Sequence, residues 1–178
     1  MPIDPVLNLE FVHSSDIIVL MAKRTKLQIK EDIFKFINSN GIMTLATHSS
    51  KGPWVSTVYY GADSEMNLYI VTDPNSIHGK FFSKDNRVAF NIFDSRQKIV
   101  GPLKGLQGKG SIEIVKGIIN NTRALYLWHK ANPGAEKNIT IEKVKKLADT
   151  KLFKITPNYL KFFNKALYTP EEYGIWEA

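Results

Sequence analysis

The sequence predicts a mainly β protein of the α+β class, with about six short antiparallel strands in a closed or partly closed barrel and helices added between and around them. Three observations lead to this prediction. The residue pattern changes from helical to strand period after Gly41. Short turns join the first strands, which is typical of an antiparallel meander. Short helical segments then interrupt and follow the later strands.

The first helix and the first strands are marked by clear local signals. Thr25 and Gln28 have capping-box spacing, and apolar residues recur at helical spacing until Asn40-Gly41, so a helix is predicted over about 27–39. Strands are predicted at 42–48, 53–61 and 67–72, separated by tight turns. Asp73–Ser76 then has turn and cap chemistry, which opens a short helix ending near Lys84.

The second half of the chain returns to strands and carries two more helices. Gly108 and Gly110 predict a bulge or a close backbone approach within a long strand. The predicted elements are strands at 87–94, 106–115, 151–156 and 159–163, helices at 119–131 (capped by Asn120, Asn121 or Thr122) and 141–148, and an irregular tail from residue 168. In that tail we expect Trp176 to anchor the chain against the barrel.

The composition fits a single folded domain. With 178 residues, 43% apolar and 11% aromatic, the chain can bury a core, and it fits one domain with helical additions better than two. The formal charge of +7 suits nucleic acid, an acidic surface or an anionic cofactor as a partner and does not choose among them. The absence of cysteine excludes disulfides, thiolate catalysis and cysteine-ligated zinc.

The first residues show no targeting or membrane signal. The apolar run Ile17–Ala22 is too short to span a bilayer and no basic segment precedes it, so we expect a cytoplasmic protein with no membrane partner. Because Met21 stands just before the first convincing helix, residues 1–20 are either an extension or an artefact of start-site choice. We expect an N-terminal extension over 1–24 and a single domain over 25–178.

The junction between the third strand and the next helix is the most informative stretch for function. A helix N-terminus near Ser76 presents unpaired N–H groups and a partial positive charge, which suit an anion. The hydroxyls of Thr72 and Ser76 and the ammonium of Lys80 suit a phosphate, although each such contact is worth only about 0.3–1 kcal/mol near a helix end. An ordinary helix cap with a solvated lysine is the alternative interpretation.

A series of motifs runs through about half of the chain, from Ile42 to Val115. In order, these are Pro53-Trp54-Val55-Ser56-Thr57-Val58-Tyr59, Leu68-Tyr69-Ile70-Val71-Thr72, Ser76-Ile77-His78, Phe82, Asp85-Asn86-Arg87-Val88 and Leu106-Gln107-Gly108-Lys109-Gly110. In order and spacing they resemble the pyridoxamine 5'-phosphate oxidase-like family of FMN-binding split barrels. The family has Ser-x-Lys where this chain has Ser76-Ile77-His78, and an arginine-rich phosphate contact where this chain has only Ser56 and Thr57. Lys80 is the residue that supplies a charge near the histidine.

The resemblance implies a six-stranded antiparallel split β-barrel that binds FMN at the interface of a homodimer. The residues expected to line the isoalloxazine, largely through backbone groups, are Ser56, Thr57, Val58 and Tyr59. The residues expected to hold the phosphate and ribityl end are Thr72, Ser76, His78 and Lys80. Gln107 is expected to reach the flavin, usually from the other subunit. Without the resemblance, Val58 and Tyr59 are plain strand core and Gln107 is a solvated strand residue.

The function implied by the resemblance is that of an FMN-dependent oxidoreductase acting on a small-molecule substrate or electron donor. No residue pair resembles a dedicated acid–base or nucleophilic apparatus, so no catalytic residue is assigned. True pyridoxamine phosphate oxidase activity is not expected, because residues 172–178 lack that enzyme's arginine-rich motif. A non-catalytic flavin or heme binding or sensor protein is the alternative, and a basic module for nucleic acid is a third interpretation.

Other polar residues predict little. His13, His48 and His129 are scattered without metal-ligand spacing, so no metal site is predicted. Asp63 lies in a predicted turn and is expected to be solvated. The lysines of the last predicted helix are expected to form a solvated face.

Overall fold

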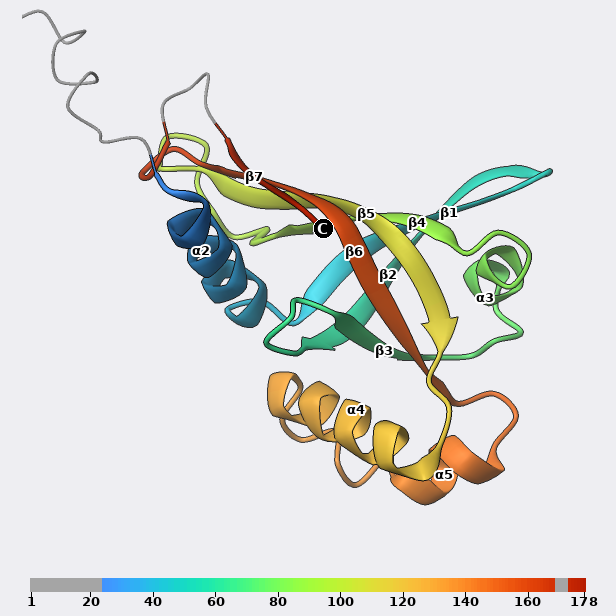
Figure 1. Ribbon diagram of the computed structural model, residues 1–178. Helices are drawn as coiled ribbons and strands as arrows, with labels where there is room; N and C mark the ends of the chain where they lie inside the picture. The colour runs from blue at the N-terminus through green and yellow to red at the C-terminus, as the bar shows by residue number, and fades with distance from the viewer. Residues whose placement is uncertain (1–23, 169–172) are drawn as a thin grey trace, which may run out of the picture.

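The structure, a computed structural model, describes residues 24–168 and 173–178 (Figure 1). The predicted N-terminal extension lies outside the described residues except for Arg24, as do Ile17–Ala22 and His13. Among the described residues, no helix has the length and apolar content needed to cross a lipid bilayer.

The described strands form one antiparallel sheet that curls into a ring. The strands are β1 (Ile42–Ser49), β2 (Gly52–Ala62), β3 (Leu68–Thr72), β4 (Arg87–Phe93), β5 (Lys104–Ile114), β6 (Lys151–Asn164) and β7 (Gly174–Glu177). Their order is β3-β2-β1-β4-β5-β6-β7, and an additional pairing of β3 with β6 closes the first six into a ring. The predicted six-stranded antiparallel split β-barrel with added helices is therefore confirmed.

The interior of the ring is filled by one apolar face of each strand, because strand side chains alternate between the two faces. Met43, Leu45, Tyr60, Ile70 and Ile92 are among the residues buried in this core. The helix α2 (Lys26–Asn38) adds Ile33, Phe36 and Ile37 to it. The capping box predicted at the start of α2 is present, with the Thr25 hydroxyl accepting from the Gln28 amide at 3.2 Å.

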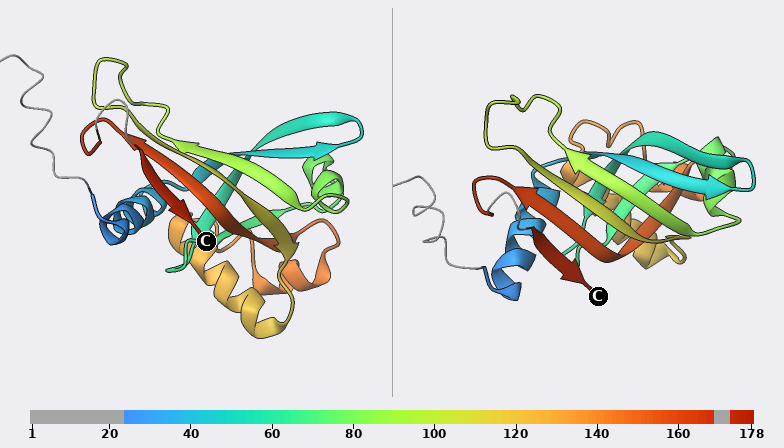
Figure 2. Two further views of the ribbon diagram at one scale, coloured as in Figure 1. Left: turned by 45° about the horizontal axis from the view of Figure 1, so that its top comes forward. Right: turned by 90° about the horizontal axis from the view of Figure 1, so that it is seen from above.

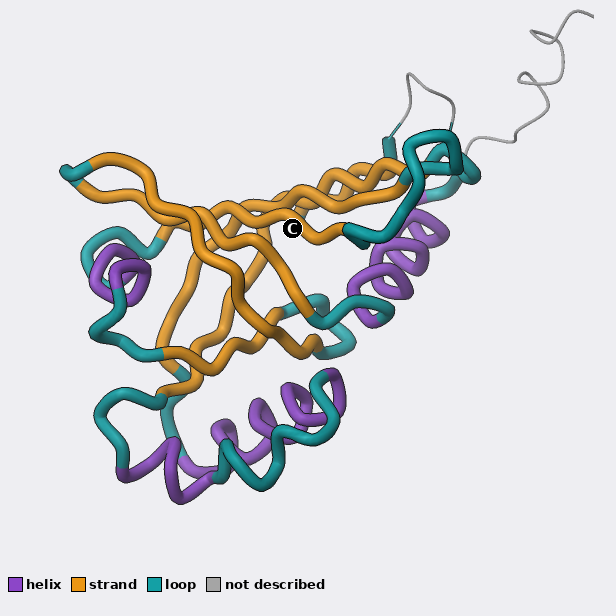
Figure 3. The backbone as a smooth tube through the Cα atoms, turned by 180° about the vertical axis from the view of Figure 1, so that it is seen from behind, coloured by secondary structure: helices purple, strands orange, loops and turns teal. Residues whose placement is uncertain are grey.

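Helices α4 (Ile118–Ala131) and α5 (Ile141–Lys146) lie together along the outer side of β3, where they cover a second, smaller apolar cluster (Figures 1 and 3). The close approach of α4 to β2 depends on Gly61, since a Cβ there would stand 2.3 Å from the carbonyl oxygen of Leu127. The Trp128 indole N–H donates to the Tyr59 carbonyl at 3.2 Å across the same contact.

The predicted caps of α4 are wrong. Its N-cap is Gly117 at φ +83°, with no side-chain cap hydrogen bond. The side chains of Asn120, Asn121 and Thr122 instead donate to the carbonyls four residues earlier, so none of them accepts from a backbone N–H at the start of the helix. A glycine reaches the left-handed conformation without a Cβ penalty, so it can begin the helix without a polar side chain.

Three further predictions need correction, of which two concern the end of the chain and one concerns Asp63. The strands predicted at 151–156 and 159–163 are one strand, β6, which continues through Pro157. Pro157 lies opposite Gly110, where the β5–β6 register shifts, so its missing N–H falls at a bulge. A Cβ on Gly110 would be 2.2 Å from the Thr156 carbonyl oxygen, which confirms the predicted close backbone approach.

The tail that was predicted to be irregular contains the strand β7, which pairs with β6 and places Trp176 opposite Leu160. Trp176 packs against the barrel core, as expected.

Asp63, which was expected to be solvated, is buried. It is 7% exposed and accepts hydrogen bonds from the Asn67 amide and the Tyr69 hydroxyl, at 2.9 and 3.0 Å.

Helix α3 (Ile77–Phe82) lies at one end of the ring, and the β1–β2 hairpin projects beside this same end (Figure 2). It packs against β1 and β2. Its Phe82 side chain is buried in the core and meets the ring of Phe153 edge-on, with 4.8 Å between the ring centroids. This end of the barrel contains most of the residues that the sequence assigned to a flavin.

Candidate functional site

The four candidate residues on β2 do not share one face. Val58 is buried in the barrel core, whereas Tyr59 is 57% exposed on the outer surface, as expected for neighbours on a strand. Ser56 is on the same side of the strand as Val58. Its hydroxyl oxygen is buried and has no hydrogen-bond partner among the described residues. Unpartnered buried hydroxyls are uncommon, so this oxygen needs an explanation.

The hydroxyl of Ser76 works as a helix cap. It accepts from the Gly79 amide at 3.1 Å and donates to the Asp73 carbonyl at 2.6 Å. The ordinary-cap interpretation therefore describes the side chain of Ser76. Lys80 lies one turn further along α3, and its side chain is exposed.

Thr72 and His78 are brought together by the turn that joins β3 to α3. The Thr72 hydroxyl oxygen is 2.6 Å from Nε2 of His78, a hydrogen bond whose direction depends on the histidine tautomer. The His78 ring also packs on Phe82, with 6.1 Å between ring centroids. Burial lowers the pKa of His78 below its ordinary value, against a smaller opposing effect of Asp73. The ring is thus a neutral hydrogen-bonding group near pH 7.

Gln107 lies on the outer face of the sheet, away from this pair. The strand registers place Thr57, Thr44, Asn91 and Gln107 in one row across β2, β1, β4 and β5. Neighbouring strands are about 4.8 Å apart, so Gln107 stands roughly 14 Å from Thr57 within one chain. One chain therefore does not bring these two predicted residues together.

The same outer face carries several exposed apolar side chains. Val55 is 59% exposed, Tyr59 57%, Phe93 46% and Ile42 45%. Two hollows adjoin Ile42 on this face. One, of about 460 Å³, is lined by Thr44, Thr57, Asn91 and Phe93, among others. The other, of about 510 Å³, is lined mainly by apolar groups, including Tyr59 and Trp128. A contiguous apolar surface of this kind is typical of an interaction site.

Sequence reasoning did not identify this face, although part of the signal was present. The alternation in β4 already separates Asn91 from Val88, Phe90 and Ile92, and so indicates an outward-pointing asparagine. The pairing of Asn91 with Thr44 depends on strand register across distant segments, which the alternation does not contain. Among the described residues, no group of His, Asp and Glu has the geometry to hold a metal ion.

No protein-family model matches the chain. A UPF0306 protein of Pasteurella multocida is 32% identical to it over 96 residues, which are 53% of this chain and 64% of that protein. The alignment therefore spans just under two thirds of the relative. A protein of Clostridium acetobutylicum superposes with a TM-score of 0.61 at 15% identity, covering 86% of this chain and 96% of that one. It is related to general stress protein 26 and is described as a member of the pyridoxinephosphate oxidase family. This chain has the pyridoxamine phosphate oxidase-like split-barrel fold.

A heme binding protein from Mycobacterium smegmatis has the same split barrel. It superposes with a TM-score of 0.67 at 16% identity, covering 88% of this chain and 59% of that one. At these identities the likeness establishes the fold.

Tested against FMN, those residues fit through uncharged hydrogen-bonding groups. The buried Ser56 hydroxyl lacks a partner, and the Thr72–His78 pair lies at the same end of the barrel. Positive charge at this end comes from the exposed Lys80, because His78 is neutral. These residues therefore offer a flavin several uncharged hydrogen-bonding groups and one positively charged side chain.

Proposed function

We propose that this chain binds FMN on its split barrel, forms a homodimer and acts as a flavin-dependent oxidoreductase on a small-molecule substrate or electron donor. The observation that supports this most strongly is the unpartnered buried hydroxyl of Ser56, on the strand that the resemblance assigns to the flavin. Leaving such a group unsatisfied costs about 1–3 kcal/mol, and a ligand atom that bonds to it recovers that cost.

The phosphate end is proposed to lie at Thr72, His78 and Lys80. The neutral His78 ring, at present bonded to Thr72, donates one hydrogen bond to a phosphate when that 2.6 Å contact opens. Lys80 adds the positive charge that His78 lacks. Because a neutral ring replaces a lysine, we expect this chain to retain FMN less tightly than a split barrel with Ser-x-Lys. Washing during purification is therefore expected to remove part of the flavin.

The second subunit is proposed to cover the outer face of β2, β1 and β4. Val55, Tyr59 and Phe93 are exposed there, and their burial stabilises an association. Because Gln107 is too far from Thr57 to reach a flavin on its own β2, a two-fold arrangement of this face allows Gln107 of the partner subunit to approach instead. The homodimer thus completes a site that one chain leaves open.

The redox chemistry belongs to the flavin, which exchanges electrons with the substrate or donor when bound. The chain contributes position and surroundings. Ser56 and the backbone of β2 orient the ring system, and Thr72, His78 and Lys80 hold the phosphate.

The test is reconstitution with FMN followed by anaerobic addition of NADH or NADPH. We expect a yellow protein after gel filtration, with a visible band that bleaches with the donor and returns with oxygen. Lys80→Gln is expected to weaken FMN binding, while Lys84→Gln, which removes a charge just beyond α3, serves as the matched control. A preparation that stays colourless after saturation with FMN would contradict the proposal.

A non-catalytic flavin or heme binding protein is the second candidate. It is favoured by the likeness to the heme binding protein from Mycobacterium smegmatis and by the His78 ring, which burial keeps neutral. This candidate predicts a yellow protein that no donor bleaches, or a Soret band that saturates with one hemin per chain and is lost in His78→Ala.

A further inference from the structure

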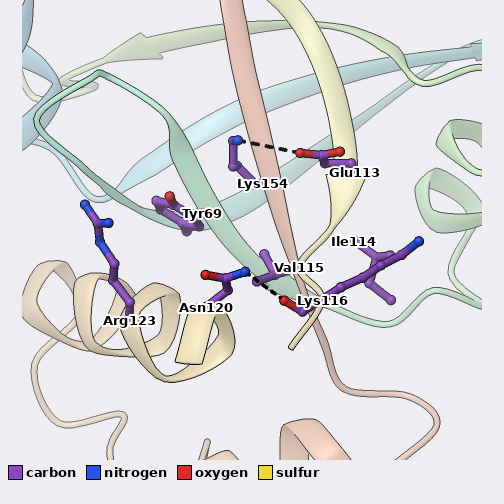
Figure 4. A pocket seen from close by; sticks show the side chains of 8 residues that line it. All are labelled: Tyr69, Glu113, Ile114, Val115, Lys116, Asn120, Arg123 and Lys154. Atoms are coloured by element: carbon purple, nitrogen blue, oxygen red, sulfur yellow. Dashed lines mark hydrogen bonds and ion pairs between the residues drawn. The ribbon is translucent and has the colours of Figure 1, made fainter. Parts of the chain in front are cut away.

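We propose that the cavity between α4 and the β5–β6–β3 surface is a second ligand site, which binds the phosphate group of a small phosphorylated molecule. The cavity has a volume of about 440 Å³ and opens to solvent. It is separate from the flavin site, and the proposal does not depend on flavin binding. Its lining includes Tyr69, Glu113, Asn120, Arg123 and Lys154 (Figure 4).

The floor of the cavity is a row of three side chains across three strands. Lys154 on β6 is paired in register with Tyr69 on β3 and with Glu113 on β5. Side chains in register on neighbouring strands point to the same face of the sheet. The Lys154 side chain is 30% exposed, so its stem is packed while its ammonium group faces the cavity.

The ammonium of Lys154 is only loosely neutralised. Its contact with the Glu113 carboxylate is 3.5 Å long, and the Glu113 side chain is 67% exposed. An exposed pair of this kind contributes about 0–1 kcal/mol. A buried or bidentate partner would hold the ammonium firmly, whereas this one leaves it able to exchange Glu113 for a ligand oxyanion.

Arg123 provides a second cation from the opposite wall. In Figure 4 its side chain rises from α4 toward the side of the cavity where Tyr69 lies. The pKa of Tyr69 also reflects the proximity of Arg123. Burial raises the pKa of Tyr69 to about 12, and a hydrogen bond to Asp63 adds to the increase. The positive charge of Arg123 opposes this increase. None of the ion pairs found among the described residues engages Arg123.

The nearby carboxylate of Asp63 is already occupied by other donors. It accepts hydrogen bonds from the amides of Glu65 and Asn67, the Asn67 side chain and the Tyr69 hydroxyl. The lining also includes Lys116, so three cations stand against one carboxylate, Glu113. The balance is two positive charges in a polar cavity, which favours an anion.

Phosphate is the anion that this arrangement suits best. A guanidinium binds two phosphate oxygens through its fork of N–H groups, and an ammonium acts on a third as a point charge. A cavity of about 440 Å³ is within the range of small-molecule sites and leaves room for an organic group beyond the phosphate. That group would lie against Ile114 and Val115, which also line the cavity.

The test uses inorganic phosphate and pyrophosphate, titrated into the full chain by isothermal calorimetry at constant ionic strength. The titration is repeated in Lys80→Gln, which removes a charge at the proposed flavin site, so binding that persists in this variant reports on the cavity beside α4. We expect saturable binding that falls roughly tenfold or more in Arg123→Gln and in Lys154→Gln, as for lost hydrogen bonds between charged groups. Lys130→Gln, on the same helix but outside this lining, removes the same charge and is expected to bind as the wild type. Thermal unfolding of each variant checks that it is folded.

Acetate under the same conditions provides the chemical control, and we expect it to bind at least tenfold more weakly than phosphate. Three results would overturn the proposal. The first is the absence of saturable phosphate or pyrophosphate binding. The second is an equal loss in Lys130→Gln, which indicates attraction by net charge alone. The third is phosphate binding that is unchanged in folded Arg123→Gln and Lys154→Gln. None of these results bears on whether the chain binds FMN.

Discussion

Replacing Ser56 by alanine is expected to change the stability of the flavin-free chain and its affinity for flavin in opposite directions. The Ser56 hydroxyl is buried without a hydrogen-bond partner, and such a group costs about 1–3 kcal/mol. Alanine removes this unpartnered oxygen, so we expect Ser56→Ala to stabilise the flavin-free chain by about 1 kcal/mol or more. For a chain of this length each kcal/mol raises Tm by about 2–4 °C.

Flavin binding is expected to change in the opposite direction. If the hydroxyl bonds to FMN, its loss costs about 0.5–1.5 kcal/mol, which weakens binding roughly 2- to 12-fold. Urea unfolding without flavin and quenching of FMN fluorescence measure the two effects separately. Ser111→Ala, at an exposed position of β5, is the matched control and is expected to change neither. A flavin-free Ser56→Ala chain less stable than the wild type, or one that binds FMN equally well, would refute the role assigned to this hydroxyl.

Three further outcomes follow from the packing, the titration and the surface of the barrel. Gly61→Ala is expected to destabilise the chain by about 1–3 kcal/mol in urea unfolding, because its Cβ meets the backbone of Leu127; an unchanged midpoint would contradict the close packing of α4 on β2. The pKa of His78 is lowered in the folded chain, so below the ordinary histidine pKa of about 6.5 the unfolded chain takes up a proton that the folded chain resists. Stability is therefore predicted to fall as the pH is lowered from about 7.5 to about 5.5. Unfolding across that range is expected to show a smaller fall in His78→Gln than in the wild type, and an equal slope in the two proteins would count against the assignment. Tyr59→Asp is expected to yield monomers in light scattering, since it places a charge in the proposed dimer face, and a dimer of unchanged strength would move the interface elsewhere.

Much of the fold could be predicted from short-range signals. The capping box of Thr25, the tight turns between β1, β2 and β3, and the alternation in β4 predicted these elements nearly at their observed bounds. Pro157 was a misleading signal, because a proline ordinarily ends a central strand. Here its missing N–H falls where the register with β5 shifts between Lys109 and Gly110, and that pairing is with a strand distant in sequence. The prediction of the N-cap of α4 was wrong for a similar reason. Three polar candidates were present in the sequence, but the backbone conformation of Gly117 decides where the helix begins.

The candidate site could be predicted only in part, because it depends on contacts between distant segments. The sequence identified Thr72, Ser76 and His78 as neighbours of one turn and offered both a helix cap and a phosphate contact for Ser76; the structure shows the cap. It did not identify the row from Thr57 to Gln107, which requires the register of four strands. The cavity of Arg123 and Lys154 was equally out of reach, since it arises where α4 crosses strands that only the closed ring brings together.

Native mass spectrometry of the chain after incubation with FMN measures the flavin and the dimer in a single experiment. We expect a species of two chains that carries two FMN molecules, with the flavin lost when the dimer is dissociated in the gas phase. A single chain that retains FMN, or a dimer whose mass is unchanged by excess FMN, would contradict a flavin site completed by a second copy of this barrel.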